Sequence, residues 1–156
     1  GVVVAGPDLN AAKFTRGYAE AIWKDFDLNV PIALVEKRRN PSTGKTEILN
    51  VIGNVRSKNI LLVDDMIGTG GTIFDAETAF RDRGAKRIWA LATHGVFSGE
   101  FFSRIVESPI ERVFITNSID NHNPLCDKIS IISVAPLLAE AIFRVHTDQS
   151  VSSLFE

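Results

Sequence analysis

Short apolar runs alternate along the chain with segments in which apolar residues recur every three or four positions. The runs are typical of strands and the periodic segments of helices, because each element buries residues at its own period. Predicted strands span residues 2–5, 31–37, 46–53, 59–64, 87–93, 112–117 and 129–133. Predicted helices span residues 10–26, about 98–106 and 136–146, and a further one places Ile73, Ala76 and Phe80 on one side. The alternation predicts a single-domain α/β fold, a mostly parallel sheet flanked by helices.

Composition narrows the class of protein. The chain has 156 residues and a formal charge of −2, so no basic excess points to nucleic acid. Its one cysteine, Cys126, excludes an intrachain disulfide and favours a reducing, cytoplasmic location. We expect that thiol to be inert. No apolar run approaches the ~18 residues of a membrane span, so no membrane partner is expected.

The first residues, GVVVAGPD, read as a strand with no polar segment before it. Domains usually begin with a frayed surface segment. We therefore expect the chain to be one part of a longer protein.

The segment LLVDDMIGTGGT, residues 61–72, follows a strand and precedes a helix. Glycines at this junction let several backbone N–H groups face one point, and a helix N-terminus favours anions. Thr69 and Thr72 add hydroxyl donors. A plain turn with one of these threonines as helix N-cap is the alternative, but the three glycines favour phosphate binding.

Asp64 and Asp65 precede this loop at the predicted carboxyl end of a strand. Solvated turn acids are the simple interpretation. The functional one is a ligand that carries both phosphate and vicinal hydroxyls, such as a sugar phosphate, with Mg²⁺ nearby to relieve repulsion. A phosphoacceptor receiver domain also uses paired acids, but its acidic strand comes first, whereas about sixty residues precede this one.

The loop resembles the phosphoribosyl-diphosphate-binding motif of the type I phosphoribosyltransferase fold. The segments AGPDLNAAKF, ALVEKRRN, LLVDDMIGTGGT, ATHGVFSGEFFSRI, FITNSI, APLLAEAIFRVH and SVSSLF follow the order of the C-terminal half of ribose-phosphate diphosphokinases. The resemblance covers nearly all of the chain. It implies a C-terminal domain, residues 1–156, of a longer two-domain, oligomeric enzyme that transfers diphosphate from Mg-ATP to ribose 5-phosphate, making phosphoribosyl diphosphate for nucleotide biosynthesis.

The resemblance also implies residue roles. Lys37 and Arg39 would be catalytic, and Asp8 would lie beside Mg²⁺ and the diphosphate. The substrate-binding residues would be Asp64, Asp65, Gly68, Thr69, Gly70, Gly71 and Thr72. Ser150, Ser152 and Phe155 match a regulatory phosphate or ADP site between subunits. Without its other half, the chain is not expected to turn over.

Simple alternatives stand beside several of these roles. Lys37, Arg38 and Arg39 could be a solvated charge cluster, and the C-terminal segment could be edge packing. His94, His122 and His146 are assigned no chemistry.

Departures from the family pattern leave two rival functions open. Gly68 replaces an acid in the loop, and Leu9, Asn10 and Ala11 stand where glycines usually follow Asp8. Ser153 stands where Tyr is common. These changes permit a non-catalytic regulatory or assembly subunit. A salvage phosphoribosyltransferase would share the loop, but the THGVFSG segment and the C-terminal residues argue against it.

Overall fold

The computed structural model describes residues 1–39, 46–120 and 126–155. Seven strands form one sheet: β1 (Val2–Gly6), β2 (Ile32–Arg39), β3 (Thr46–Ile52), β4 (Asn59–Ile67), β5 (Arg87–Gly95), β6 (Arg112–Thr116) and β7 (Ile129–Ile132). The helices are α1 (Ala12–Phe26), α2 (Gly71–Asp82), α3 (Phe101–Glu107) and α4 (Ala135–His146), followed by a 3₁₀ turn, η1 (Ser152–Leu154).

The strand order is β3-β2-β1-β4-β5-β6-β7. Neighbouring strands run parallel except β2 and β3, which pair antiparallel. This confirms the predicted mostly parallel sheet. After β1 the chain builds the sheet in one direction, and from β4 it builds in the other. The carboxyl ends of β1 and β4 thus form a topological switch point, where α/β proteins bind ligands.

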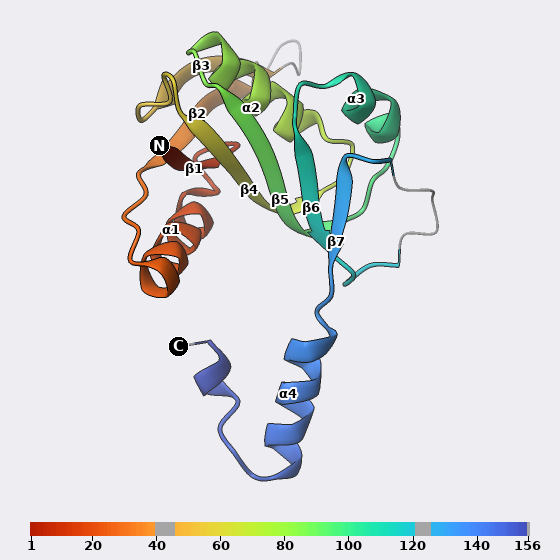
Figure 1. Ribbon diagram of the computed structural model, residues 1–156. Helices are drawn as coiled ribbons and strands as arrows, with labels where there is room; N and C mark the ends of the chain where they lie inside the picture. The colour runs from red at the N-terminus through yellow and green to blue at the C-terminus, as the bar shows by residue number, and fades with distance from the viewer. Residues whose placement is uncertain (40–45, 121–125, 156) are drawn as a thin grey trace.

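The helices cover the two faces of the sheet unequally. A large core, which includes Phe80 of α2 and Phe101 of α3, lies on one face. A smaller cluster on the other face places Phe14 and Tyr18 of α1 against Val4 and Val63. The helices that follow β1 and β4, α1 and α2, therefore pack on opposite faces of the sheet (Figure 1).

Two element boundaries differ from the sequence prediction in ways that matter for the site. β4 continues to Ile67, so Asp64 and Asp65 lie within the strand, where Asp64 pairs with Ala92 of β5. α3 begins at Phe101, because the residues before it form a turn in which Phe97 and Gly99 have positive φ.

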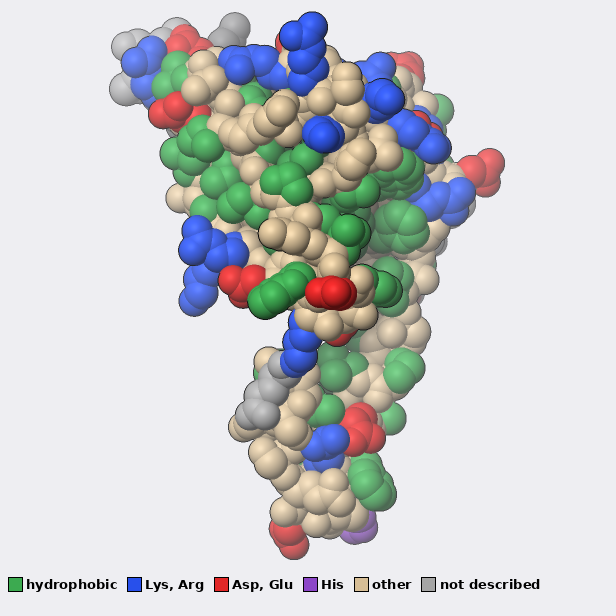
Figure 2. Space-filling model, turned by 60° about the vertical axis from the view of Figure 1, so that its left-hand side comes forward, with side chains coloured by type: hydrophobic (Ala, Val, Ile, Leu, Met, Phe, Trp, Pro, Cys, Tyr) green, Lys and Arg blue, Asp and Glu red, His purple; other side chains and the backbone are tan. Residues whose placement is uncertain are grey.

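The last helix, α4, projects from the sheet together with the C-terminal segment (Figure 1). The space-filling view shows this part extending beyond the body of the molecule (Figure 2). No residue of α4 is buried, and Leu138, Ile142 and Val145 are 56%, 69% and 67% exposed. The periodic apolar residues of 136–146 thus form a helix, but no core covers them. Among the described residues, no helix is long and apolar enough to cross a membrane.

Candidate functional site

Two adjoining hollows lie at the switch point between β1 and β4. One, of about 320 Å³, is lined by Asp8 and by residues 64–73. The other, of about 300 Å³, shares Asp8, Asp64 and Asp65 with it and continues toward α1. The fold therefore brings Asp8 together with Asp64, Asp65 and the glycine-rich loop, although Asp8 and Asp64 are 56 residues apart in the sequence.

A larger hollow of about 550 Å³ runs along α1, where Phe14, Gly17, Tyr18 and Ala21 line it beside Asn10 and Lys13. Its walls are mainly apolar. Size alone would favour this hollow, but convergent polar groups mark a ligand site better than volume does. The carboxylates and the loop make the smaller pair the candidate site.

The start of α2 offers backbone donors to the first hollow. Its N-cap residue is Gly70, whose φ of 77° is left-handed and which has no side chain to cap the helix. The Thr69 hydroxyl accepts only a long hydrogen bond, 3.5 Å, from Gly71 N. Neither threonine is thus the N-cap, contrary to the simple alternative. A helix start without a side-chain cap leaves backbone N–H groups available, and such a start is suited to an anion.

Gly70 is fixed by aromatic packing beneath the loop. A Cβ on Gly70 would lie 2.4 Å from the Phe74 ring and 2.8 Å from the Phe101 ring. The Phe97 ring stacks on Phe101 with centroids 4.4 Å apart, and the guanidinium of Arg104 lies 4.3 Å from the Phe74 ring centre. The phenylalanine-rich run after β5, which supplies Phe97 and Phe101, is a signal in the sequence for this packing.

The turn after β5 braces the loop from the other side. Val96 N and Phe97 N donate to Ile67 O at 3.0 and 3.1 Å, and Ser98 N donates to Gly68 O at 3.1 Å. These bonds hold the ends of β4 and β5 together past the last residues of the sheet. The loop backbone is therefore fixed before any ligand arrives, which reduces the ordering that binding requires.

Asp64 and Asp65 accept hydrogen bonds from the chain just beyond them. Asp64 Oδ1 accepts from Asp65 N at 3.0 Å, and Asp65 Oδ1 accepts from Met66 N at 2.7 Å. Burial raises the pKa of Asp64 from 3.8 to about 6, and the charges of Asp65 and Asp8 act in the same direction. Burial and the neighbouring acids thus make the charged form of Asp64 unfavourable, and a ligand that brings hydroxyl donors or a cation would stabilise it.

We expect Asp64→Asn to stabilise the unliganded chain near neutral pH. Because the folded-state pKa of Asp64 lies above its unfolded value, the stability associated with this group is full below pH 3.8 and is lost as pH rises through about 6. The substitution removes that loss, so at pH 7.5 it should raise the free energy of unfolding by about 1 kcal/mol, allowing for solvent screening.

Urea unfolding at several pH values measures this effect. The difference between Asp64→Asn and the wild type should shrink as pH falls from 7.5 toward 4. Glu20→Gln, on the exposed side of α1, serves as the control and should stay within about 0.5 kcal/mol throughout. A gap between the Asp64→Asn and wild-type curves that is the same at every pH would contradict the raised pKa.

Asp8 follows β1 and orders the start of α1. Its Oδ1 accepts from Asn10 N at 2.9 Å and from Ala11 N at 3.2 Å. Both bonds use one carboxylate oxygen, which leaves Oδ2 as the oxygen that could contact a cation. No group of three or more His, Cys, Asp or Glu side chains suited to a metal occurs in the described parts of the chain. Mg²⁺ does not need such a group, since it commonly uses one or two carboxylates together with substrate phosphates and water.

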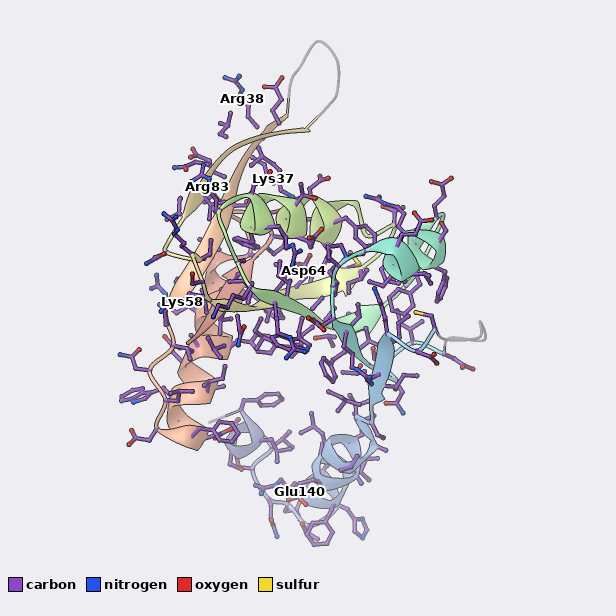
Figure 3. All side chains as sticks on the ribbon, turned by 45° about the horizontal axis from the view of Figure 1, so that its top comes forward. Lys37, Arg38, Lys58, Asp64, Arg83 and Glu140 are labelled. Carbon is purple, nitrogen blue, oxygen red and sulfur yellow. The ribbon has the colours of Figure 1, made fainter. Side chains whose placement is uncertain are left out.

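The adjacent basic residues Lys37 and Arg38 extend in different directions. Lys37 Nζ donates to Thr72 O at 3.1 Å, which places the ammonium at the first turn of α2. Arg38 instead pairs with Glu47 of β3 at 3.3 Å, and its side chain is 66% exposed. Figure 3 shows Lys37 beside α2 and Arg38 farther out on the β2–β3 pair. Arg39 pairs with Thr46 through the backbone, but its side chain lies outside the described residues, as does the segment 40–45.

Lys37 does not itself line the two hollows, and neither do the remaining candidates. Ser150, Ser152 and Phe155 lie beyond α4, where Arg144 donates to Ser150 O at 3.1 Å and Phe155 is 81% exposed. At the end of β5, the Nδ1 atom of His94 and the hydroxyl oxygen of Ser118 share a hydrogen bond of 2.7 Å. His94 thus belongs to the strand, where it pairs with Met66 of β4, and His122 lies outside the described residues.

The fold and its hollow define a doubly wound α/β domain with a candidate anion site at the switch point. A family model, the phosphoribosyl synthetase-associated domain, matches residues 25–156. The chain belongs to this family.

Relatives with curated names cover nearly the whole chain. Ribose-phosphate pyrophosphokinase of Caldanaerobacter subterraneus is 46% identical over 99% of this chain and 47% of its own length. The Helicobacter pylori protein of that name is 42% identical over 98% of this chain and 46% of its own. A crystal structure of phosphoribosylpyrophosphate synthetase from Mycobacterium smegmatis superposes with a TM-score of 0.81 at 32% identity, over 94% of this chain and 45% of the other. The chain thus spans about half the length of the relatives it matches.

Proposed function

We propose that this chain is the ribose 5-phosphate-binding domain of a ribose-phosphate diphosphokinase, and that it forms the C-terminal half of that enzyme. One observation carries the proposal: three carboxylates and an uncapped helix start surround one hollow. A sugar phosphate offers hydroxyl donors to the carboxylates and an anion to the helix. The relatives bear the name of this enzyme over the matched region, which supports the same assignment.

The loop from Gly68 to Thr72 would hold the 5-phosphate. Its amides and the Thr69 and Thr72 hydroxyls donate to phosphate oxygens, and the positive end of the α2 macrodipole favours the charge. Asp64 and Asp65 would accept hydrogen bonds from the ribose hydroxyls. Engaging hydroxyl donors would lower the pKa of Asp64 from its raised value, so the strain in the free site is relieved when the ligand binds.

Asp8 would contribute to Mg²⁺ binding beside the diphosphate. Its carboxylate lines the same hollow as Asp64 and Asp65, and a cation there would reduce repulsion between the acids and the ligand phosphates. When bound, Mg²⁺ neutralises charge on the phosphoryl groups of ATP. Lys37 and Arg39, both on β2, would neutralise the remaining negative charge of these phosphoryl groups.

The other half of the enzyme would supply the nucleotide contacts. Among the residues that line the two hollows, Phe14 is the one aromatic side chain on which a nucleobase could stack. We therefore propose that the other half of the enzyme and neighbouring subunits of a homo-oligomer bind ATP. The 156-residue chain alone would then bind the sugar phosphate without turnover. Ser150, Ser152 and Phe155 remain candidates for a regulatory anion site.

A second function, a non-catalytic regulatory subunit, is favoured by Gly68. A Cβ at this position would meet only the Ser98 hydroxyl, at 3.9 Å. The site therefore has room for the acid that the family pattern places there, so its absence is not imposed by packing. Loss of that carboxylate removes one contact to a ribose while leaving the phosphate loop intact.

Calorimetric titration of the chain with ribose 5-phosphate and Mg²⁺ tests the proposed function. We expect saturable binding, weakened tenfold or more in the Asp64→Asn/Asp65→Asn double variant, because each lost hydrogen bond to a charged group is worth about 1.5–3 kcal/mol. Ribose without phosphate, and phosphate without ribose, should each bind more weakly. No binding by a folded chain would refute a self-sufficient sugar-phosphate site.

A complete protein that carries this chain separates the two functions. Release of AMP from ATP that depends on ribose 5-phosphate supports the diphosphokinase. Binding of ribose 5-phosphate without AMP release supports the regulatory subunit.

A further inference from the structure

Lys37 reaches the rim of the hollow because it continues an inward-facing row of β2. Ala33 and Val35 face the core beneath α2, and the strand period of two places Lys37 on the same face. A register shift between Glu36 and Lys37 changes the pairing with β3 at this point. The ammonium then ends at the carbonyl of Thr72, 3.1 Å away.

This is an unfavourable place for a free cation. Thr72 belongs to the first turn of α2, where the macrodipole is positive and repels an ammonium group. Partial burial adds to the penalty and lowers the pKa of Lys37. Three carboxylates oppose both effects: Asp75 on α2, Asp8 after β1 and Asp64 on β4.

Among these three carboxylates, Asp75 differs in position. Asp8 and Asp64 line the hollow, so a bound cation or sugar hydroxyl would compete for them. Asp75 does not line either hollow. It lies three residues after Thr72, which places it about one turn farther along the same side of α2. Its charge therefore stays available to Lys37 when the site fills.

We propose that Asp75 is a positioning residue that holds the Lys37 ammonium at the Thr72 carbonyl, on the rim of the phosphate loop. The inference rests on the proposed function, in which Lys37 meets the ligand's phosphoryl charge. In the described part of the chain no ion pair within 4.0 Å joins the two side chains, so Asp75 acts through space. Lys37 thus keeps its hydrogen-bonding capacity for an anionic ligand.

NMR of the 156-residue chain labelled with ¹³C at lysine Cε measures the interaction without any ligand. The Lys37 signal is assigned by its loss in Lys37→Arg. Asp75→Asn should lower the pKa of Lys37 by roughly half a unit to one unit, the size expected for a partly solvated charge several ångströms away. Asp75→Glu should restore most of the shift. Asp82→Asn, at the other end of α2, is the matched control and should leave the Lys37 signal unchanged.

A second titration shows whether the positioning matters to a ligand. Inorganic diphosphate should bind Asp75→Asn two- to fivefold more weakly than the wild type, and the gap should widen with pH as Lys37 loses its proton sooner. An unchanged Lys37 pKa in a folded Asp75→Asn variant overturns the proposal, and so does a lowered pKa that Asp75→Glu fails to restore. If Lys37 responds to Asp75 but the wild type does not bind ribose 5-phosphate, the positioning stands and the proposed function fails.

Discussion

Gly70→Ala should reduce the free energy of unfolding by about 2–5 kcal/mol. A non-glycine residue in the left-handed region costs about 1–2 kcal/mol, and Gly70 has a φ of 77°. The added methyl group would also lie 2.4 Å from the Phe74 ring. Overpacking a core in this way typically costs a further 1–3 kcal/mol.

Gly68→Ala is the matched control for this prediction. It adds the same methyl group two residues earlier, where φ is not positive and the nearest atom is 3.9 Å away. We expect its stability to stay within about 0.5 kcal/mol of the wild type. Urea unfolding of the two variants side by side checks the difference. Equal stability of the two variants would mean that the aromatic cluster does not hold the loop.

The same pair of variants separates loop geometry from loop composition. Gly70→Ala must shift the backbone that presents the N–H groups of α2, so it should weaken ribose 5-phosphate binding even where the chain remains folded. Gly68→Ala, which leaves this backbone unstrained, should weaken binding less than Gly70→Ala does. Both glycines belong to the same short loop, but the left-handed φ of Gly70 and the rings of Phe74 and Phe101 distinguish it from Gly68.

The sequence predicted the parts of the site that depend on chain-local patterns. The strand pattern predicted that Asp64 lies at the carboxyl edge of a sheet, whereas only the family resemblance placed Asp8 at the site, and the structure puts both residues in one hollow. The glycine-rich loop was expected to open a helix, and α2 begins at Gly71. The position of Asp64 and the start of the helix follow from hydrophobic period and from glycine spacing, which operate over a few residues.

Other features depend on contacts between distant segments and had no local signal. β4 continues through Asp64 and Asp65 because β5 pairs with it as far as Gly95. Asp75 is an ordinary helical acid in the sequence, and its nearness to Lys37 depends on how β2 packs beside α2. In α4 the apolar period correctly predicted a helix. It did not tell whether the helix is covered, and none of the residues of α4 is buried.

Lys37→Ala should lower the turnover number of a complete protein that carries this domain by about 100- to 1,000-fold. This corresponds to about 2.7–4 kcal/mol, the loss seen when one preorganised charge donor is removed from a transition state. The expectation follows from the position of Lys37, since its ammonium is half-buried and held at the rim of the hollow by Thr72 O. Single-turnover release of AMP measures the chemical step directly.

Arg38→Ala provides the control, because it removes a neighbouring cation of the same run. Arg38 is 66% exposed and pairs with Glu47 rather than with the loop, and exposed pairs contribute little. Its turnover number should change less than about threefold. Equal losses in the two variants would indicate that the basic run acts through its overall charge. A loss confined to Lys37→Ala would instead mean that the inward face of β2 carries a specific donor to the reacting phosphates.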